Sequence, residues 1–273
     1  MLGDVIDHLI CPVCGAGLRL DAGSARCARG HAFDVARQGY VNMLTGSAAP
    51  GTADTPAMVA SRAAFLEAGH YRPLAVRLRE LCAGAGVVAD AGAGTGHYLA
   101  GALGEGAVGI ALDVSKHALK RAARSHPRVG AVVADVWRAL PVRDGAADVL
   151  LNVFAPRNAP EFARILRPDG LLVVVTPAPG HLSPIVERLG LLRVDEDKER
   201  RLEDTLGEDF APAGREDVEI ALDLDHKAVE AVVGMGPSAW HTRPGEVAVL
   251  IAELPDPVRV TASFRIGTWR AHR

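Results

Sequence analysis

Three of the four cysteines stand near the N-terminus, in the segment CPVCGAGLRLDAGSARCARGHAFD. Together with one histidine they have the spacing Cys11-x2-Cys14-x12-Cys27-x3-His31. Two ligand pairs separated by a short hairpin fit tetrahedral coordination of zinc by three thiolates and one imidazole. Four protein ligands leave no open position for water, so the sequence predicts a structural zinc site rather than buried free thiols. Cys82 stands alone on the apolar face of a helical segment, and we interpret it as a core residue.

A second signature is the stretch DAGAGTG, which follows a short apolar strand and contains Asp90, Gly92, Gly94 and Gly96. Dinucleotide folds use a related G-x-G-x-x-G loop to bring a pyrophosphate to a helix N-terminus. An acid two residues before the first glycine would repel a pyrophosphate, but it suits a cofactor with an ammonium group. S-adenosylmethionine has that group and no phosphate. We therefore expect S-adenosylmethionine, held where the glycines let the backbone approach it closely.

Two further acids follow the next two strands along the chain. Asp113 ends the strand in GIALDVS, where a carboxylate can accept hydrogen bonds from both ribose hydroxyls, and Asp135 ends the strand in VVADVW, where it fits the adenine amino group. Open α/β sheets bind ligands at the carboxyl ends of their strands. The alternative role for both acids is to cap the helix that follows, and the two roles can coexist.

These residues need a sheet to bring them together. The segments VVADAGAG, GIALDVS, AVVADV, ADVLLNVF and GLLVVVTP are short, apolar and mostly β-branched, and helical segments lie between them. This alternation predicts an α/β fold with a doubly wound, mostly parallel, Rossmann-like sheet. With the expected cofactor and two further strands near the C-terminus, we expect a seven-stranded methyltransferase sheet. The segments VEIALDLD and VRVTASFRIGTWR, separated by a helical insertion, predict an antiparallel edge. Two helices broken at Gly69, the second opened by Pro73, are expected before the first strand.

The chain has 273 residues, enough for one large and one small domain. We expect a zinc-binding module over 1–44, a linker over 45–56 and the methyltransferase domain over 57–273. The net charge of −3 excludes a dominant basic field, so a surface for nucleic acid must be local. The sequence shows neither an apolar run of about 20 residues nor a signal peptide, so we expect a cytoplasmic protein without membrane contact.

Several motifs resemble those of one known family. They are CPVC…CARGHAFDVARQGYVNML, SRAAFLEAGHYRPL, DAGAGTGHY, NVFAPRNAPEFARILRPDG and MGPSAW. Together they resemble the 23S ribosomal RNA guanine-N1 methyltransferases of the RlmA group, over residues 9 to about 269. NVFAPRN and ARQGYVN are most similar to the actinobacterial branch linked to tylosin and mycinamicin resistance. The resemblance implies methylation of guanine N1 in a hairpin loop of 23S rRNA, with macrolide resistance as its expected consequence.

The resemblance also implies roles for individual residues. The three cysteines and the histidine of the first motif match the family's zinc ligands, and Gly94 and Thr95 match loop residues that touch the cofactor. Tyr71 and His181 match two further cofactor contacts. The position of His181 after the fifth strand supports this, whereas Tyr71 alone would be expected to pack in a helix. The family's MTPF-W type segment appears here as Met-Gly-Pro-Ser-Ala-Trp, residues 235–240.

The resemblance makes the zinc module a candidate RNA-recognition arm. A basic run after the second strand could form a phosphate track with the arginines of that module, although a solvated helix face is the competing interpretation. The run comprises Lys116, Lys120, Arg121, Arg124 and Arg128. Trp137, Phe154 and Trp240 could stack on the target base, with core packing as the alternative. Asp34 and His97 could accept the N1 proton; no catalytic residue is assigned.

Two other functions compete with rRNA methylation. A small-molecule methyltransferase would share the glycine loop, but a small acceptor needs no separate zinc module. A zinc-dependent binding protein without activity would not need the intact loop and its downstream acids. Related enzymes pair up around RNA, so a homodimer is a further candidate partner arrangement.

Overall fold

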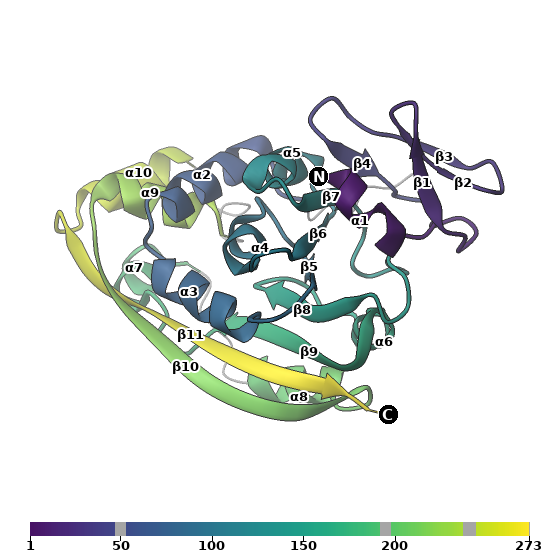
Figure 1. The fold of residues 1–273 in the computed structure, drawn as a ribbon. Helices are drawn as coiled ribbons and strands as arrows, with labels where there is room; N and C mark the ends of the chain where they lie inside the picture. Colours follow the sequence, from purple (N-terminus) through teal and green to yellow (C-terminus); the bar gives the residue numbers. More distant parts are fainter. Residues whose placement is uncertain (47–52, 192–197, 237–243, 273) are drawn as a thin grey trace.

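The computed structural model describes residues 1–46, 53–191, 198–236 and 244–272. A three-stranded sheet near the N-terminus, in the order β1-β2-β3, lies beside an eight-stranded sheet in the order β10-β11-β9-β8-β5-β6-β7-β4 (Figure 1). The doubly wound, mostly parallel fold is confirmed. The predicted number of strands, seven, is wrong, because a strand from the N-terminal part joins the large sheet as its eighth.

The five central strands are parallel and carry the motifs that suggested a cofactor. They are β5 (Val87–Ala91), β6 (Val108–Asp113), β7 (Val129–Val133), β8 (Ala147–Val153) and β9 (Leu166–Pro177). The antiparallel edge predicted from the C-terminal sequence is also present. It consists of β10 (Phe210–Leu224) and β11 (Val258–Ala271), and the ribbon they form runs along one side of the molecule in Figure 1.

Helices cover both faces of the large sheet, and each face has its own apolar core. One face is covered by α2 (Pro56–Glu67), α3 (Arg72–Leu81), α4 (His97–Ala102), α5 (Lys116–Ser125), α7 (Ser183–Arg188), α9 (His226–Gly234) and α10 (Pro244–Ala252). The other face is covered by α1 (Leu2–Val5), α6 (Ala159–Ile165) and α8 (Lys198–Leu206). Gly69, with φ of 84°, breaks α2 from α3 as predicted.

The N-terminal sheet is built around the predicted hairpin. Strands β1 (Leu18–Asp21) and β2 (Ser24–Cys27) pair antiparallel, and the two residues between them, Ala22 and Gly23, both have positive φ. Two-residue hairpin turns of this kind match the twist of the flanking strands. Strand β3 (Ala32–Asp34) completes the sheet, and a short 3-10 helix, η1 (Ile6–His8), precedes it.

Two contacts join this N-terminal part to the large sheet. Strand β4 (Tyr40–Asn42) pairs in parallel with β7, with Val41 opposite Val132. Helix α1 packs on β6 and β7. The connection from β7 to β8, residues 134–146, contains no helix of its own. A methyl group added at Gly130 would lie 2.1 Å from a methyl carbon of Val5, so α1 rests directly on the strand. The division of the chain at residue 44 stays a prediction.

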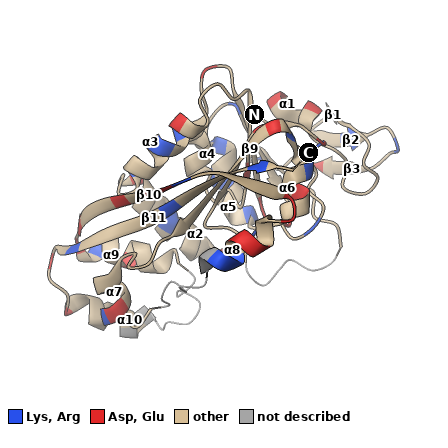
Figure 2. Ribbon diagram, turned by 90° about the horizontal axis from the view of Figure 1, so that it is seen from below, with Lys and Arg blue, Asp and Glu red and all other residues tan. Residues whose placement is uncertain are grey.

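Charged residues of both signs lie on the face seen in Figure 2, and both occur along α8. This mixed distribution agrees with the small net charge. Within the described ranges, no helix has the length and apolar character needed to cross a membrane.

Candidate metal centre and cofactor pocket

The four predicted zinc ligands form one cluster. The ligand atoms of Cys11, Cys14, Cys27 and His31 all lie within 4.8 Å of one another. The sulfurs of Cys14 and Cys27 are 3.8 Å apart, and Nδ1 of His31 lies 3.5 Å from Cys11 Sγ and 3.4 Å from Cys27 Sγ. Zinc–sulfur bonds of about 2.3 Å place tetrahedral sulfurs about 3.8 Å apart. The donor set and spacing therefore fit a zinc ion bound through Nδ1 of the histidine.

The backbone around Cys27 favours the thiolate form of this ligand. Burial raises the pKa of Cys27, but hydrogen bonds from the backbone of His31 and Arg29 outweigh it and lower that pKa to about 6. The amide of Gly15 donates to the carbonyl of Cys11, which closes the first turn of the ligand loop. Because a thiolate is the form that binds metal, these hydrogen bonds prepare Cys27 for a cation, whereas burial raises the pKa of Cys11.

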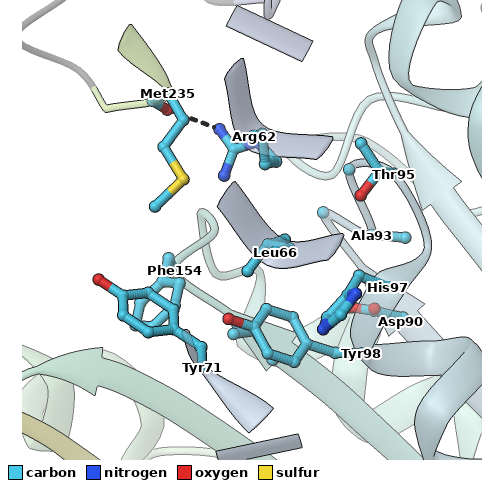
Figure 3. Close-up of a pocket in the computed structure, with 13 residues that line it drawn as sticks. Arg62, Leu66, Tyr71, Asp90, Ala93, Thr95, His97, Tyr98, Phe154 and Met235 are labelled. Carbon is cyan, nitrogen blue, oxygen red and sulfur yellow. Dashed lines mark hydrogen bonds between the residues drawn. The ribbon is translucent and has the colours of Figure 1, made fainter. Parts of the chain in front are cut away.

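A pocket opens at the carboxyl ends of β5 and β8, next to the glycine loop (Figure 3). Its walls border about 420 Å³ of empty space, part of which is open solvent. Five of the predicted cofactor residues line it, namely Tyr71, Asp90, Gly92, Gly94 and Thr95. The strand order explains why these residues lie together. The loop after β5 is at the switch point of a doubly wound sheet, where such folds bind ligands.

Asp90 is the most perturbed acid in the pocket. Its side chain is almost fully buried, and the Oδ1 atom has no hydrogen-bond partner. Burial, and to a lesser extent the charge of Asp113, raises the pKa of Asp90 to about 8. The hydroxyl of Tyr98, which lines the same pocket, is likewise buried without a partner. Buried polar atoms are normally hydrogen-bonded, so an acceptor and a hydroxyl left open on one pocket fit a polar ligand with an ammonium group.

Asp113 organises the glycine loop from the next strand. Its Oδ2 accepts a hydrogen bond from the amide of Gly94 at 2.8 Å, and its Oδ1 accepts one from the amide of Ser115 at 2.7 Å. Burial raises its pKa, although these amides oppose the shift. The suggested capping role is wrong for Asp113, because the side chain of Ser115 caps α5 by accepting from Ala118. A carboxylate can still accept from ribose hydroxyls through its remaining lone pairs.

Tyr71 and His181 lie together. The hydroxyl of Tyr71 is 3.4 Å from Nε2 of His181, and Nδ1 of His181 is 2.9 Å from the carbonyl oxygen of Ser263. A carbonyl can only accept, so Nδ1 carries a proton, and in the neutral ring Nε2 accepts from the tyrosine. Tyr71 also packs on Phe264, with ring centroids 4.8 Å apart. The two residues that the resemblance assigned to cofactor contact thus form one hydrogen-bonded pair beside the pocket.

The glycines of the loop have different tasks. A methyl group at Gly92 would lie 2.2 Å from the Cβ of Ala155, and one at Gly96 would lie 2.9 Å from the backbone of Ala122. Both have positive φ. Gly92 therefore allows the segment after β8 to touch the loop, whereas Gly96 allows α5 to approach it. Gly94 also has positive φ, and a methyl group there would be at an ordinary contact distance, 3.6 Å, from the side chain of Arg62.

Asp135 stands apart from the other predicted residues. It lies two residues beyond β7, accepts a hydrogen bond from the amide of Trp137 at 3.0 Å and approaches Arg138 at 3.5 Å. It is not part of the pocket lining. Its predicted contact with adenine stays a prediction.

Sequence reasoning missed one residue that crosses the pocket. Arg62 of α2 donates to Asp54 at 2.8 Å and to the carbonyl of Met235 at 2.9 Å, and its side chain lies 3.6 Å from where a methyl group at Gly94 would stand. In Figure 3, Arg62 and Met235 lie across the opening from Tyr71 and Phe154. An arginine at helical spacing between the buried Met58 and Phe65 was the available signal.

A broader groove adjoins the pocket and shares Leu66, Thr95 and His97 with it. Four cations line the groove: Arg37 after β3, and Lys120, Arg121 and Arg124 on α5. Glu67 is the acid of this lining, 3.8 Å from Arg121. Three of the five residues of the predicted basic run therefore line one groove together with Arg37 of the N-terminal part.

Other expectations for RNA contact are corrected. Arg128 does not join the groove, because its guanidinium donates to the carbonyls of Ala107 and Gly104. Core packing, the alternative for Trp137 and Phe154, is wrong for both, since each is exposed. Trp240 and most of the 235–240 segment lie outside the described residues.

The two candidate proton acceptors differ in position. His97 lines both the pocket and the groove, and burial lowers its pKa in spite of the nearby Glu67, so the ring is neutral at pH 7. Asp34 accepts from Ser24 at 2.9 Å and lies in neither lining.

Two family models match the chain, in agreement with these two sites. Residues 9–46 match the family described as "RlmA, N-terminal", and residues 89–174 match "Methyltransferase domain". The fold also resembles the YcgJ protein of Bacillus subtilis, with a TM-score of 0.52 and 15% identity over 75% of this chain and 100% of that one. Fold and site together define an S-adenosylmethionine-dependent methyltransferase with an N-terminal zinc ribbon.

Two relatives match along nearly the whole chain. A 23S rRNA (guanine(748)-N(1))-methyltransferase of Streptomyces fradiae is 53% identical over 99% of both chains. A protein of Micromonospora griseorubida, named as a 23S rRNA guanine-N1 methyltransferase, is 51% identical over 98% of both. The chain belongs to the RlmA-type 23S rRNA guanine-N1 methyltransferases.

Proposed function

We propose that this protein methylates N1 of the guanine that corresponds to position 748 of 23S rRNA, within a hairpin loop. The position is the one named for the Streptomyces fradiae relative. The observation that carries the proposal is the meeting of a cofactor pocket and a basic groove at Leu66, Thr95 and His97. An RNA strand held in the groove would have its loop at the mouth of the pocket.

The cofactor-binding residues in this proposal are those expected from the sequence. Asp90 would bind the ammonium group, Gly94 and Thr95 would lie along the methionine part, and Asp113 would accept from the ribose. The remaining members are Tyr71, Gly92, Gly96, Asp135 and His181. S-adenosylmethionine supplies the methyl group for an in-line displacement by the acceptor nitrogen. The chain would contribute position and exclusion of water, and His97, which lines both the pocket and the groove, would accept the N1 proton.

The groove supports recognition of RNA rather than of a small acceptor. Its cations come from α5 and from the zinc ribbon, so phosphates of one hairpin could contact both. Phosphate contacts position a nucleic acid without reading its sequence. A loop guanine can leave its stack at low cost, which suits a buried methyl donor. The zinc ion, bound by four protein ligands, would hold the ribbon folded and has no part in the transfer.

The test is methyl transfer to unmodified 23S rRNA, with the position mapped by reverse transcription. N1 methylation blocks the Watson–Crick edge, so we expect one strong stop at the loop guanine. A protein that binds S-adenosylmethionine but leaves rRNA unlabelled would contradict the proposal and favour a small-molecule acceptor. Drug susceptibility of a strain that carries the gene would test the proposed macrolide resistance.

Cytoplasmic action follows from a ribosomal substrate and stays part of the proposal. A homodimer stays a prediction, which light scattering with and without an rRNA hairpin would test.

A further inference from the structure

Phe154, at the end of β8, has an unusual conformation. Its φ is 55°, in the left-handed region that non-glycine residues seldom adopt. Its amide still donates to the carbonyl of Val175 at 3.1 Å, so the ladder to β9 ends at this residue. Such conformations persist only where surrounding contacts hold them, and they gather at functional sites.

The surrounding contacts are in the turn that follows. Asn152 is fully buried, and its amide nitrogen donates to the carbonyls of Ala91 at 2.9 Å and Pro156 at 2.8 Å. The turn also touches the glycine loop, because Gly92 leaves room for Ala155. The turn is thus tied to the end of β5 and the start of the glycine loop, and Phe154 has a defined place beside the cofactor pocket.

The ring of Phe154 is the outward-facing member of an aromatic group. It lies 5.5 Å from the ring of Phe264 and 6.4 Å from that of Tyr98. Phe264, Tyr98 and Tyr71 are at most 9% exposed, whereas Phe154 is 38% exposed and lines the pocket. An apolar ring that could pack inward is instead held toward the opening.

From these observations we propose that Phe154 is the platform on which the target guanine stacks when it leaves the RNA. An aromatic ring accepts any base on its face, and such stacking is a general means of holding unstacked bases. The ring lines the pocket on the side opposite Met235 and Arg62 (Figure 3). The groove joins this pocket at Leu66, Thr95 and His97, so a base that enters from the groove would reach the ring inside the pocket that would hold the methyl donor. This assignment rests on the proposed rRNA activity and names a residue that acts on the substrate rather than on the cofactor.

The experiment is a binding cycle with S-adenosylhomocysteine present and two rRNA hairpins. One hairpin has the target guanine, and the other has an abasic ribose at that position. We expect wild-type protein to prefer the guanine hairpin and Phe154→Asn to lose roughly 5- to 50-fold of that preference. Asparagine tolerates positive φ, so the variant removes the ring without adding backbone strain. Phe154→Tyr should restore the preference.

The same proteins are assayed for affinity toward S-adenosylmethionine and for single-turnover methyl transfer. We expect cofactor affinity within twofold of wild type and a transfer rate lowered about as much as the guanine preference. Val76→Ala, an exposed apolar truncation on α3, serves as the control and should change neither. Phe154→Leu is measured as well, so that misfolding of the asparagine variant cannot hide the result.

Two outcomes would overturn the assignment. An unchanged guanine preference in both ringless variants would show that the base does not stack there. Weakened cofactor binding with the preference retained would place the ring against S-adenosylmethionine instead. Failure of the proposed function is a separate result, because wild-type protein would then leave the guanine hairpin unmethylated.

Discussion

The hydroxyl of Tyr71 and Nε2 of His181 lie 3.4 Å apart, although 110 residues separate them in the chain. Nδ1 of His181 lies 2.9 Å from the carbonyl oxygen of Ser263, and this hydrogen bond fixes the orientation of the imidazole. The pair therefore couples the start of α3 to the segment after β9, across one wall of the cofactor pocket.

Tyr71→Phe should keep the packing of the ring and remove the hydrogen bond. A partly buried nitrogen left without its donor costs about 1–3 kcal/mol. We expect a lower melting temperature and a three- to tenfold weaker affinity for S-adenosylmethionine, measured by calorimetry. Tyr40→Phe, on β4, is the matched control. Equal affinities of Tyr71→Phe and wild type would show that the pair is structural only.

Affinity for S-adenosylmethionine should rise with pH between 6 and 7.5. The pKa of Asp90 is raised to about 8 in the free protein, so its carboxyl is mostly neutral below that pH. An ammonium group favours the ionised carboxylate, so binding releases a proton and tightens by at most about tenfold per pH unit. Asp90→Asn should abolish this slope. A slope that survives in the asparagine variant would assign it to another group.

The raised pKa of Asp90 also has a consequence for stability. The unfolded chain binds fewer protons than the folded one between the ordinary carboxyl pKa and about 8, so stability should fall as pH rises through that range. Thermal melts of the cofactor-free protein at pH 5 and 8 would show the loss, and Asp90→Asn should reduce it.

Zinc removal should destabilise more than the ribbon. The metal contributes on the order of 10 kcal/mol to folding such modules, and β4 and α1 both contact β7. We expect a chelator, or Cys11→Ser, to lower the main melting transition and to release one equivalent of zinc per chain. Cys82→Ser is the matched thiol variant and should keep its zinc. Two independent transitions, with the second unchanged by chelation, would contradict this coupling.

Charge removal in the groove should weaken RNA binding without affecting the cofactor. Lys120 and Arg124 line the groove, whereas Lys116 lies on the same helix outside it. The double change to alanine should reduce the slope of log K against log salt by about 1.5. Lys116→Ala should leave that slope near the wild-type value. Identical slopes for both proteins would place the RNA elsewhere.

Much of the fold was open to prediction because its signals are local. Apolar strands ending in acids or glycines mark the carboxyl edge of a parallel sheet, and the zinc spacing is contained within 21 residues. Strand β4 was missed because YVN is too short for a pattern and pairs with β7, nearly 90 residues away. Long-range pairing of three residues leaves no local trace.

The residues of the site can also be divided into those with a local sequence signal and those without one. Asp90 and Gly94 could be predicted because chemistry and chain position coincide there. Arg62 and Met235 could not, because their contact depends on how α2 packs beside α9. The conformation of Phe154 was equally hidden, since a positive φ at a phenylalanine arises from tertiary contacts rather than from its own preference.

The pairing of β4 with β7 also bears on how a substrate is chosen. The zinc cluster lies on the separate three-stranded sheet, but the chain that leaves this sheet pairs at once, as β4, with β7 of the sheet that forms the methyl-donor pocket. The distance between the zinc cluster and the pocket is therefore set by the pairing of β4 with β7. An RNA hairpin is expected to bind the N-terminal part through its phosphates. If the loop lies too near to these phosphates or too far from them, the guanine would not reach the pocket. The choice of a single base would then depend in part on the length of the hairpin.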